Sequence, residues 1–287
     1  SSGTCSRQLE KLRIIWLMQT RKETIRKIMT IKGVVLSQKV LGEQDKFMDV
    51  LTETGIVEIL VKGSAKITSK NGSATQLFAY TEFDVTDSFR IQNQNHKNQK
   101  NFCHLRSASP IRIFYGLRQS VQSVALASYF AQVILYSALP QASTPEILRL
   151  LLNCLHYLSE SGSKSGSESD PLQIKCIFEL RIISLLGFRP DVLMCRKCGC
   201  YLPERLYFQV ENGCFYCESC EKSGILMPAG TLQAVRHIVL QDFEKIFSFR
   251  IASHCRDSLF AFAEQFLQYH TDRHFPALEY YYKLYDI

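Results

Sequence analysis

The feature that most constrains this chain is a pair of CxxC motifs in its C-terminal half. Cys195 and Cys198 form the first motif, Cys217 and Cys220 form the second, and 18 residues separate them. A gap of roughly 15–20 residues between two CxxC pairs is the spacing of a zinc site. Four thiolates complete the tetrahedron around Zn²⁺ and leave no position for water. The motifs therefore predict one structural Zn²⁺ ion and no metal catalysis.

The residues between the two motifs predict a small hairpin. Two short runs of β-type residues, 205–210 and 214–217, flank Asn212 and Gly213. An Asn-Gly pair favours a type I′ turn, because both central positions of that turn need positive φ. We therefore expect a zinc ribbon over residues 194–221. Cys200 or Cys214 could replace one of the four ligands, and the alternative to a metal site is a group of free or disulfide-linked cysteines.

The cysteine count and the apolar runs indicate a compartment. The chain has 11 cysteines, an odd number, and four of them form the CxxC cluster. This usage favours a reducing cytoplasm over a secreted disulfide scaffold. No apolar run reaches the ~18 residues that a membrane helix needs, so we expect no membrane partner.

Residues 1–28 differ from the rest of the chain. They are basic, and Leu9, Leu12, Ile15 and Trp16 recur at helical spacing. Such a segment fits a membrane-surface helix, a transit-like segment or a DNA-binding arm. We favour an upstream extension or a cloning remnant, because Met29 begins a domain-like sequence.

Residues 29–110 predict a small β-barrel. Six short runs have apolar or alternating patterns, and turn signals such as Thr54-Gly55 and Asn71-Gly72 separate them. The runs cover residues 31–37, 47–52, 56–62, 76–85, 89–92 and 101–107. Five or six strands within about 80 residues favour a closed barrel of the OB-fold type.

Residues 111–287 predict a helical domain into which the ribbon is inserted. Apolar periodicity indicates helices over residues 117–139, 145–160, 171–186, 229–241, 253–269 and 277–285. Thr144 and Asp170 each precede a proline and are expected to be N-caps, whereas Gly187 is expected to follow a helix end. The fold class is therefore α+β and multidomain.

The net charge of +7 is unevenly distributed along the chain. Residues 1–29 carry +5, residues 30–110 carry +2, and residues 111–287 carry 0, so bulk charge does not identify a nucleic-acid partner. Residues 59–81 and 88–145, however, contain no acidic residue. We expect basic residues of these two windows to contact phosphates, which gives affinity independent of base sequence. They are Lys62, Lys66, Lys70, Arg90, Lys97, Lys100 and Arg106.

Aromatic residues in the predicted barrel could add base stacking to these phosphate contacts. The candidates are Phe78, Tyr80, Phe83 and Phe89. The alternative is a solvated basic face above ordinary core aromatics.

Catalytic motifs are missing from the sequence. It has no Walker A, GxGxxG or GxSxG pattern. His270 and His274 are four residues apart, but no third metal ligand accompanies them. We therefore expect a protein that is not an enzyme.

Four segments together resemble the bacterial RecO family of DNA repair proteins. They are VVLSQKVLGEQDKFMDVLTETGIVEILVKGSAK (34–66), HLRSAS (104–109), FELRIISLLGFRPDVLMCRKCG (178–199) and ENGCFYCESC (211–220). The resemblance spans roughly residues 29–285 in the family's order, and CRKCG with NGCFYCESC is its most specific part.

The resemblance implies an N-terminal OB-fold and a helical domain with a zinc ribbon. It places Cys195, Cys198, Cys217 and Cys220 at the ligand positions, although Cys214 stands where the family commonly has a glycine. Lys62, Lys66 and Lys70 match a basic loop after a strand, and Arg106 matches a basic position in the last barrel strand. Several relatives lack the cysteines, so the ribbon is not the chemistry of the family.

The resemblance also implies a function. It is that of a cytoplasmic, nucleoid-associated mediator that binds single- and double-stranded DNA and anneals complementary strands. Such a mediator helps to place the RecA filament on strands coated by single-strand-binding protein, and it works with RecR. A groove on the helical domain, near Arg149 or Arg181, is expected to bind the tail of single-strand-binding protein. The alternative, from another class, is a zinc-ribbon adaptor whose barrel binds RNA or protein.

Overall fold

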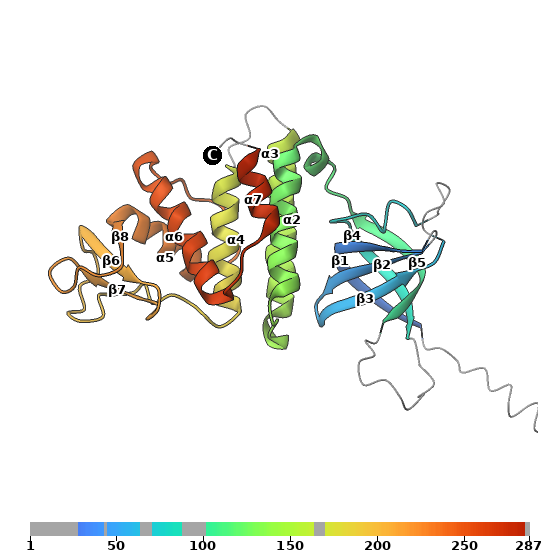
Figure 1. Cartoon of the computed structure of the whole chain (residues 1–287), viewed down its shortest axis with the longest axis horizontal. Coiled ribbons are helices and arrows are strands. Elements are labelled where there is room, and N and C mark those ends of the chain that lie inside the picture. The colour runs from blue at the N-terminus through green and yellow to red at the C-terminus, as the bar shows by residue number, and fades with distance from the viewer. Residues whose placement is uncertain (1–27, 43–44, 64–70, 88–101, 164–169, 285–287) are drawn as a thin grey trace, which may run out of the picture.

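The computed structural model describes residues 28–42, 45–63, 71–87, 102–163 and 170–284. The predicted extension over residues 1–28 lies outside this part of the chain, apart from Ile28. Figure 1 shows a β-barrel at one end of the molecule, a group of helices in the middle and a three-stranded ribbon at the other end. None of the helices in the described ranges is long and apolar enough to cross a membrane.

The N-terminal barrel confirms the predicted OB-fold. Its strands are β1 (Ile28–Leu41), β2 (Asp45–Thr52), β3 (Gly55–Val61), β4 (Tyr80–Asp87) and β5 (Cys103–Arg112). They close in the order β1-β2-β3-β5-β4, and β4 pairs again with β1. Only the β3–β5 pair is parallel within this barrel. Strand β5 reaches Arg112, two residues beyond the boundary at 110 that the sequence suggested.

Two faces of the barrel strands are buried, for different reasons. Strand alternation places one set of side chains in the barrel interior and the next set outside. The interior set is Val35, Met48, Val50, Ile59, Val61, Phe83 and Val85. Outside the barrel, Val34, Leu36 and Leu51 join the core of the helical domain. The barrel therefore has its own core and also rests on the helices.

The helices occupy nearly the ranges that apolar periodicity predicts. They are η1 (Tyr115–Gln119), α2 (Val121–Tyr136), η2 (Gln141–Ser143), α3 (Thr144–Ser163), α4 (Pro171–Leu185), α5 (Ala229–Leu240), α6 (Ser253–Thr271) and α7 (Pro276–Lys283). The helix predicted over 117–139 is confirmed over residues 121–136, but its start is wrong, because the chain breaks at Ser120 after η1. The Ser120 hydroxyl caps α2 by accepting from the backbone N–H of Ser123.

Of the other predicted helix ends, those at Asp170 and Gly187 are confirmed and the one at Thr144 is wrong. Asp170 is the N-cap of α4, as expected, since its Oδ1 accepts from Leu172 N at 3.0 Å. Gly187 follows α4 with φ +100°, which confirms its predicted role. The prediction for Thr144 is wrong. Its backbone is already helical, and its hydroxyl donates to the Pro140 carbonyl instead of capping α3.

The ribbon consists of β6 (Arg205–Gln209), β7 (Cys214–Cys217) and β8 (Ile225–Pro228), in the order β7-β6-β8. The hairpin is as predicted, but the type I′ turn is wrong. Gly213 has φ +61° whereas Asn212 does not have positive φ, and Gly213 N donates to Val210 O at 3.2 Å across a four-residue loop. Strand β8 was not predicted.

The inner face of the ribbon packs on the helices. Leu206 and Phe208 of β6 are fully buried, and the Phe208 ring lies 4.7 Å from that of Phe262 on α6. Both β6 residues belong to the same apolar core as the helices. The ribbon is therefore fused to the helical domain.

Candidate metal centre and nucleic-acid interface

The two CxxC motifs bring four sulfur atoms together. The Sγ atoms of Cys195, Cys198, Cys217 and Cys220 all lie within 4.8 Å of one another, and those of Cys198 and Cys217 are 3.6 Å apart. Tetrahedral zinc ligands with bonds of ~2.3 Å lie ~3.8 Å apart. These four cysteines can therefore hold a metal ion, and their donor set suits Zn²⁺.

Backbone hydrogen bonds shape both cysteine loops. In the first, Cys195 N donates to Cys200 O and Gly199 N donates to Cys195 O, both at 2.9 Å. In the second, Cys220 N donates to Cys217 O at 2.9 Å. The loops are joined by the Cys217 N–H, which donates to the Cys195 sulfur at 3.3 Å. The protein's own hydrogen bonds therefore shape both loops of the site.

The electrostatics of the four thiols differ. Burial opposes ionisation of Cys195, but N–H groups of Cys198, Cys217 and Lys197 donate to its sulfur and lower its pKa to about 6. The neighbouring sulfurs of Cys217 and Cys198 raise the pKa of Cys220 to about 12. Four thiolates at this separation repel one another, and a divalent cation removes that penalty. The chemistry of the cluster therefore fits a bound dication.

Two further cysteines of the ribbon lie outside the four-sulfur group. Cys200 contributes its backbone carbonyl to the first loop. The Cys214 sulfur lies 3.8 Å from the Tyr216 hydroxyl on the same strand. Neither sulfur belongs to a group of possible ligands in the described part of the chain.

The residues predicted to bind nucleic acid divide into two sets. Lys62 and Arg106 are described, and both are exposed. Lys66, Lys70, Arg90, Lys97 and Lys100 lie outside the described residues. Their roles remain predictions.

Lys62 and Arg106 both lie just beyond the short parallel pairing of β3 with β5. The pairing ends with Leu60 opposite His104; Arg106 lies two positions further along β5, and Lys62 directly follows Val61, the last residue of β3. Leu105 packs against the barrel core, so Arg106, the next residue of β5, points outward. The side chains of both Lys62 and Arg106 are exposed to solvent.

Arg106 lies in a β-bulge of β5, where this strand pairs with β4. Asp84 pairs with Ser107 and Val85 pairs with Leu105, so Arg106 has no partner in β4. Bulges of this kind redirect a side chain at a sheet surface. The Asp84 carboxylate secures the bulge by accepting from Ser107 Oγ at 2.6 Å and from Thr30 Oγ1 at 2.8 Å. These two bonds lower the pKa of Asp84.

Close to Lys62 and Arg106 along β3 and β5 lies a set of aromatic rings that was not predicted from the sequence. Phe47 pairs with Leu60, which in turn pairs with His104, so the three residues form a row across β2, β3 and β5. The Phe102 ring bridges the row, 5.3 Å from Phe47 and 5.2 Å from His104. All three rings are half-buried. The signal for Phe47 was present, because it alternates with the interior residues Met48 and Val50.

The aromatics that the sequence suggested lie elsewhere. Phe83 is fully buried in the barrel core and Phe78 is buried in the helical core, so neither can stack on a base. Tyr80 packs partly against the helical core. Phe89 lies outside the described residues.

Elsewhere on the barrel, charges of both signs are mixed. Lys32 lies 3.4 Å from Glu82, and Lys39 lies 3.8 Å from Asp49. In each of these exposed pairs the opposite charges largely neutralise each other, so the two lysines add little positive potential to the barrel surface. Within the described ranges, the case for a nucleic-acid interface therefore rests on the aromatic row with Lys62 and Arg106.

The two arginines expected near a partner groove contact other residues of the helical domain. Arg181 donates to the carbonyls of Ile238, Val239 and Gln241 at the end of α5, and it stacks on Phe243 at 4.4 Å. Arg149 lies 3.7 Å from Glu244. Neither arginine lines a cavity described here.

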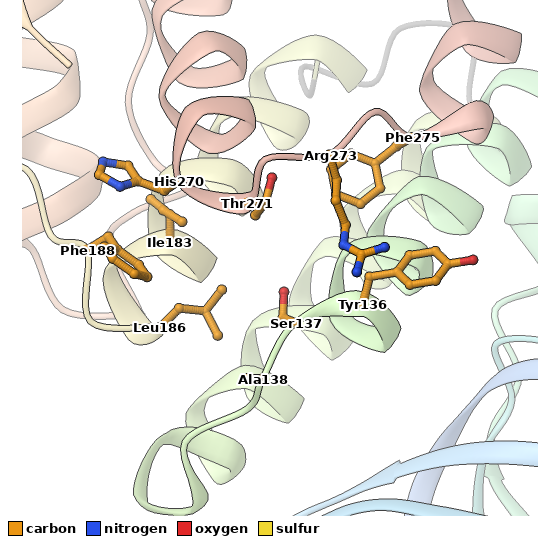
Figure 2. A pocket seen from close by; sticks show the side chains of 10 residues that line it. All are labelled: Tyr136, Ser137, Ala138, Ile183, Leu186, Phe188, His270, Thr271, Arg273 and Phe275. Atoms are coloured by element: carbon orange, nitrogen blue, oxygen red, sulfur yellow. The ribbon is translucent and has the colours of Figure 1, made fainter. Parts of the chain in front are cut away.

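A different cavity, of about 190 Å³, opens between the ends of α2, α4 and α6 (Figure 2). Ile183, Leu186 and Phe188 form an apolar wall. Opposite them, the Arg273 guanidinium lies 5.1 Å from the centre of the exposed Tyr136 ring. The cavity thus combines an apolar wall with a cation.

Comparison with known proteins agrees with this architecture. The family model described as "Recombination protein O C terminal" matches residues 118–279, and "Recombination protein O N terminal" matches residues 27–95. The DNA repair protein RecO of Acetivibrio thermocellus is 25% identical over 252 residues, which cover 86% of this chain and 94% of that protein. RecO of Caldicellulosiruptor saccharolyticus is 27% identical over 235 residues, covering 81% and 89%. This chain belongs to the RecO family.

Proposed function

We propose that this protein is a DNA-binding mediator of recombinational repair in the bacterial cytoplasm, associated with the nucleoid. It anneals complementary strands and assists the loading of RecA onto DNA coated by single-strand-binding protein. It makes and breaks no covalent bond and is therefore not an enzyme. The single observation that best supports this proposal, beside family membership, is the aromatic row of Phe47, Phe102 and His104 next to Lys62 and Arg106.

The proposed mechanism follows from the chemistry of this face. Aromatic side chains stack on bases of any sequence, at about 1–3 kcal/mol per base. Lys62 and Arg106 neutralise phosphates and release counterions. Two strands held in this way repel each other less, so pairing between them becomes faster. Double-stranded DNA would use the phosphate contacts without the stacking.

We propose that the four cysteines hold one Zn²⁺ ion with a structural role. An ion bound there would cross-link the two cysteine loops and neutralise negative charge on the four thiolates. The chain's own contribution is the Cys217 N–H bond to the Cys195 sulfur and the packing of β6 on α6.

We also propose RecR and single-strand-binding protein as partners, and the RecA filament as an indirect one. We place the tail of single-strand-binding protein in the cavity of Figure 2, where Arg273 would face a carboxylate and Ile183 and Leu186 would face an apolar side chain. This location differs from the groove that the sequence suggested near Arg149 or Arg181.

The proposal is tested by annealing complementary strands coated with single-strand-binding protein, with and without this chain. We expect faster annealing, together with single-strand binding whose log K falls steeply with log salt. No binding at low salt would contradict the proposal.

A zinc-ribbon adaptor is the second candidate. The observation that favours it is a group of exposed apolar side chains on and beside the first cysteine loop, namely Leu193, Met194, Tyr201 and Leu202. An adaptor that binds protein would show no steep salt dependence with single-stranded DNA. The same titration therefore separates the two candidates.

A further inference from the structure

Arg236 is a charged residue in an unusual place. It lies on α5, outside both CxxC motifs, and only 6% of it is exposed. A buried guanidinium is costly unless its N–H groups are paired. No carboxylate pairs with Arg236 among the ion pairs of the described residues, so backbone carbonyls must satisfy it.

Three carbonyls accept from this guanidinium. Nε donates to Val192 O at 2.6 Å, and Nη2 donates to both Leu193 O at 2.7 Å and Tyr201 O at 2.6 Å. The guanidinium carbon also lies 4.0 Å from the centre of the Tyr201 ring. One side chain thus bridges the chain that enters the first CxxC loop and the chain that leaves it.

The first loop needs such a support more than the second. Cys217 ends strand β7, so the sheet positions the start of the second loop. The first loop lies between Val192 and Tyr201, where no strand or helix is formed. It contacts the sheet through Arg196 N, which donates to Phe215 O at 3.0 Å, and through the Cys195 sulfur, which accepts from Cys217 N at 3.3 Å. Ordering a free loop costs about 1–2 kcal/mol per residue, and a prior constraint reduces that cost at the moment of metal binding.

We infer that Arg236 is a positioning residue for the metal site, which holds Cys195 and Cys198 in ligating geometry before the ion arrives. The inference rests on the proposed metal site and adds a residue outside the ligand set. Groups that orient metal ligands typically change metal affinity about 10–100-fold when they are removed. The same bonds make the ribbon's first loop a rigid extension of α5.

Arg181 supplies a matched control. It also donates to three backbone carbonyls and stacks on an aromatic ring, within the same domain. Its carbonyls belong to residues 238–241, away from the cysteine loops. Arg181→Ala should therefore destabilise the fold without touching the metal site.

The test compares the full-length wild type with Arg236→Ala, Arg236→Lys and Arg181→Ala, each loaded with zinc. Zinc release into a chromogenic chelator gives the rate of loss, and the absorption of Co²⁺-substituted protein reports the four-sulfur geometry. We expect zinc loss about 10–100-fold faster in Arg236→Ala, an intermediate rate in Arg236→Lys, and an altered Co²⁺ spectrum in Arg236→Ala. Arg181→Ala should lower the melting temperature but keep the wild-type release rate and spectrum.

Equal release from wild type and Arg236→Ala would overturn the inference, and so would equal acceleration in Arg181→Ala. If Arg236→Ala does not fold, Arg236→Lys decides, because a single ammonium lacks the separate Nε donor and cannot reach Val192 O together with Leu193 O and Tyr201 O as the planar guanidinium does. A wild type that binds neither Zn²⁺ nor Co²⁺ through four sulfurs would overturn the metal site itself, and the inference with it.

Discussion

The barrel and the ribbon are both small β-units attached to one helical core, yet they are attached in different ways. The barrel keeps an interior core of its own, and the half-buried rings of Phe47, Phe102 and His104 lie outside that core. The ribbon has no separate core, since Leu206 and Phe208 are part of the helical one. The difference favours our proposal that the barrel carries the binding surface, whereas the ribbon braces the domain on which it lies.

Removal of the metal should have the largest effect. Structural zinc contributes on the order of 10 kcal/mol of apparent binding energy at neutral pH. Chelation, or Cys217→Ser, should therefore lower the melting temperature of the helical domain strongly and leave the barrel folded. Hydrogen exchange resolved by segment would check this expectation, and equal loss of protection in β1–β5 would contradict it.

The substitution Lys175→Met should have the next largest effect, a loss of folding stability. Lys175 is fully buried, with Nζ 2.8 Å from both Glu179 and Glu264. Its loss leaves the buried Glu179 carboxylate and the half-buried Glu264 carboxylate without a cation, which costs about 3–5 kcal/mol. Chemical denaturation measures the loss, and Lys32→Met, which breaks the exposed pair with Glu82, is the control. A similarly small loss of unfolding free energy in both variants would show that the ion pairs of Lys175 do not stabilise the helical domain.

Phe47→Ala should weaken single-strand binding more than duplex binding. Loss of one stacking platform costs about 1–3 kcal/mol. Fluorescence anisotropy with single- and double-stranded oligonucleotides measures the difference. Tyr115→Ala is the matched control, because Tyr115 is 67% exposed on η1, beyond the other end of β5. Equal effects of the two substitutions would remove the aromatic row from the interface.

Lys62→Ala with Arg106→Ala should weaken binding to all sequences, by about tenfold at physiological salt, and reduce the salt slope by about 2. The control is Lys32→Ala with Lys39→Ala, whose side chains are exposed and paired with acids. An unchanged slope in the first double variant would mean that neither cation contacts a phosphate.

Ser107→Ala should have the smallest effect, on the barrel alone. Hydrogen bonds from Ser107 and Thr30 lower the pKa of Asp84 below its usual value near 3.8. A depressed carboxyl pKa stabilises the fold above the unfolded value, and the stabilisation is lost as pH falls through the folded one. The melting temperatures of wild type and variant should therefore differ at pH 7 and converge in acid. A constant difference would contradict this linkage.

The sequence predicted those features that depend on local patterns. Alternation in residues 47–51 indicated a barrel strand, Asp170 and Gly187 marked the ends of α4, and CxxC spacing brought four sulfurs together. Features that depend on pairing between distant segments were missed. Strand β8 forms only because β6 offers a free edge, and the bulge at Arg106 arises from the register between β4 and β5.

The sequence also could not predict which polar residues are buried. Arg236 resembles any helical arginine until the carbonyls of residues 192–201 surround it. Arg181, which the sequence suggested for a partner groove, is used in the same way at the end of α5. In both cases the tertiary contacts decide the role of the side chain.

The most direct test of the division between barrel and ribbon is single-strand binding by the metal-free protein. Affinity and folding of the helical domain are measured on the same sample, before and after chelation. If the barrel carries the interface, the dissociation constant should stay within about threefold of the untreated value, since the phosphate and stacking contacts remain. Loss of binding while the helical domain stays folded would place the interface on the ribbon and contradict this account.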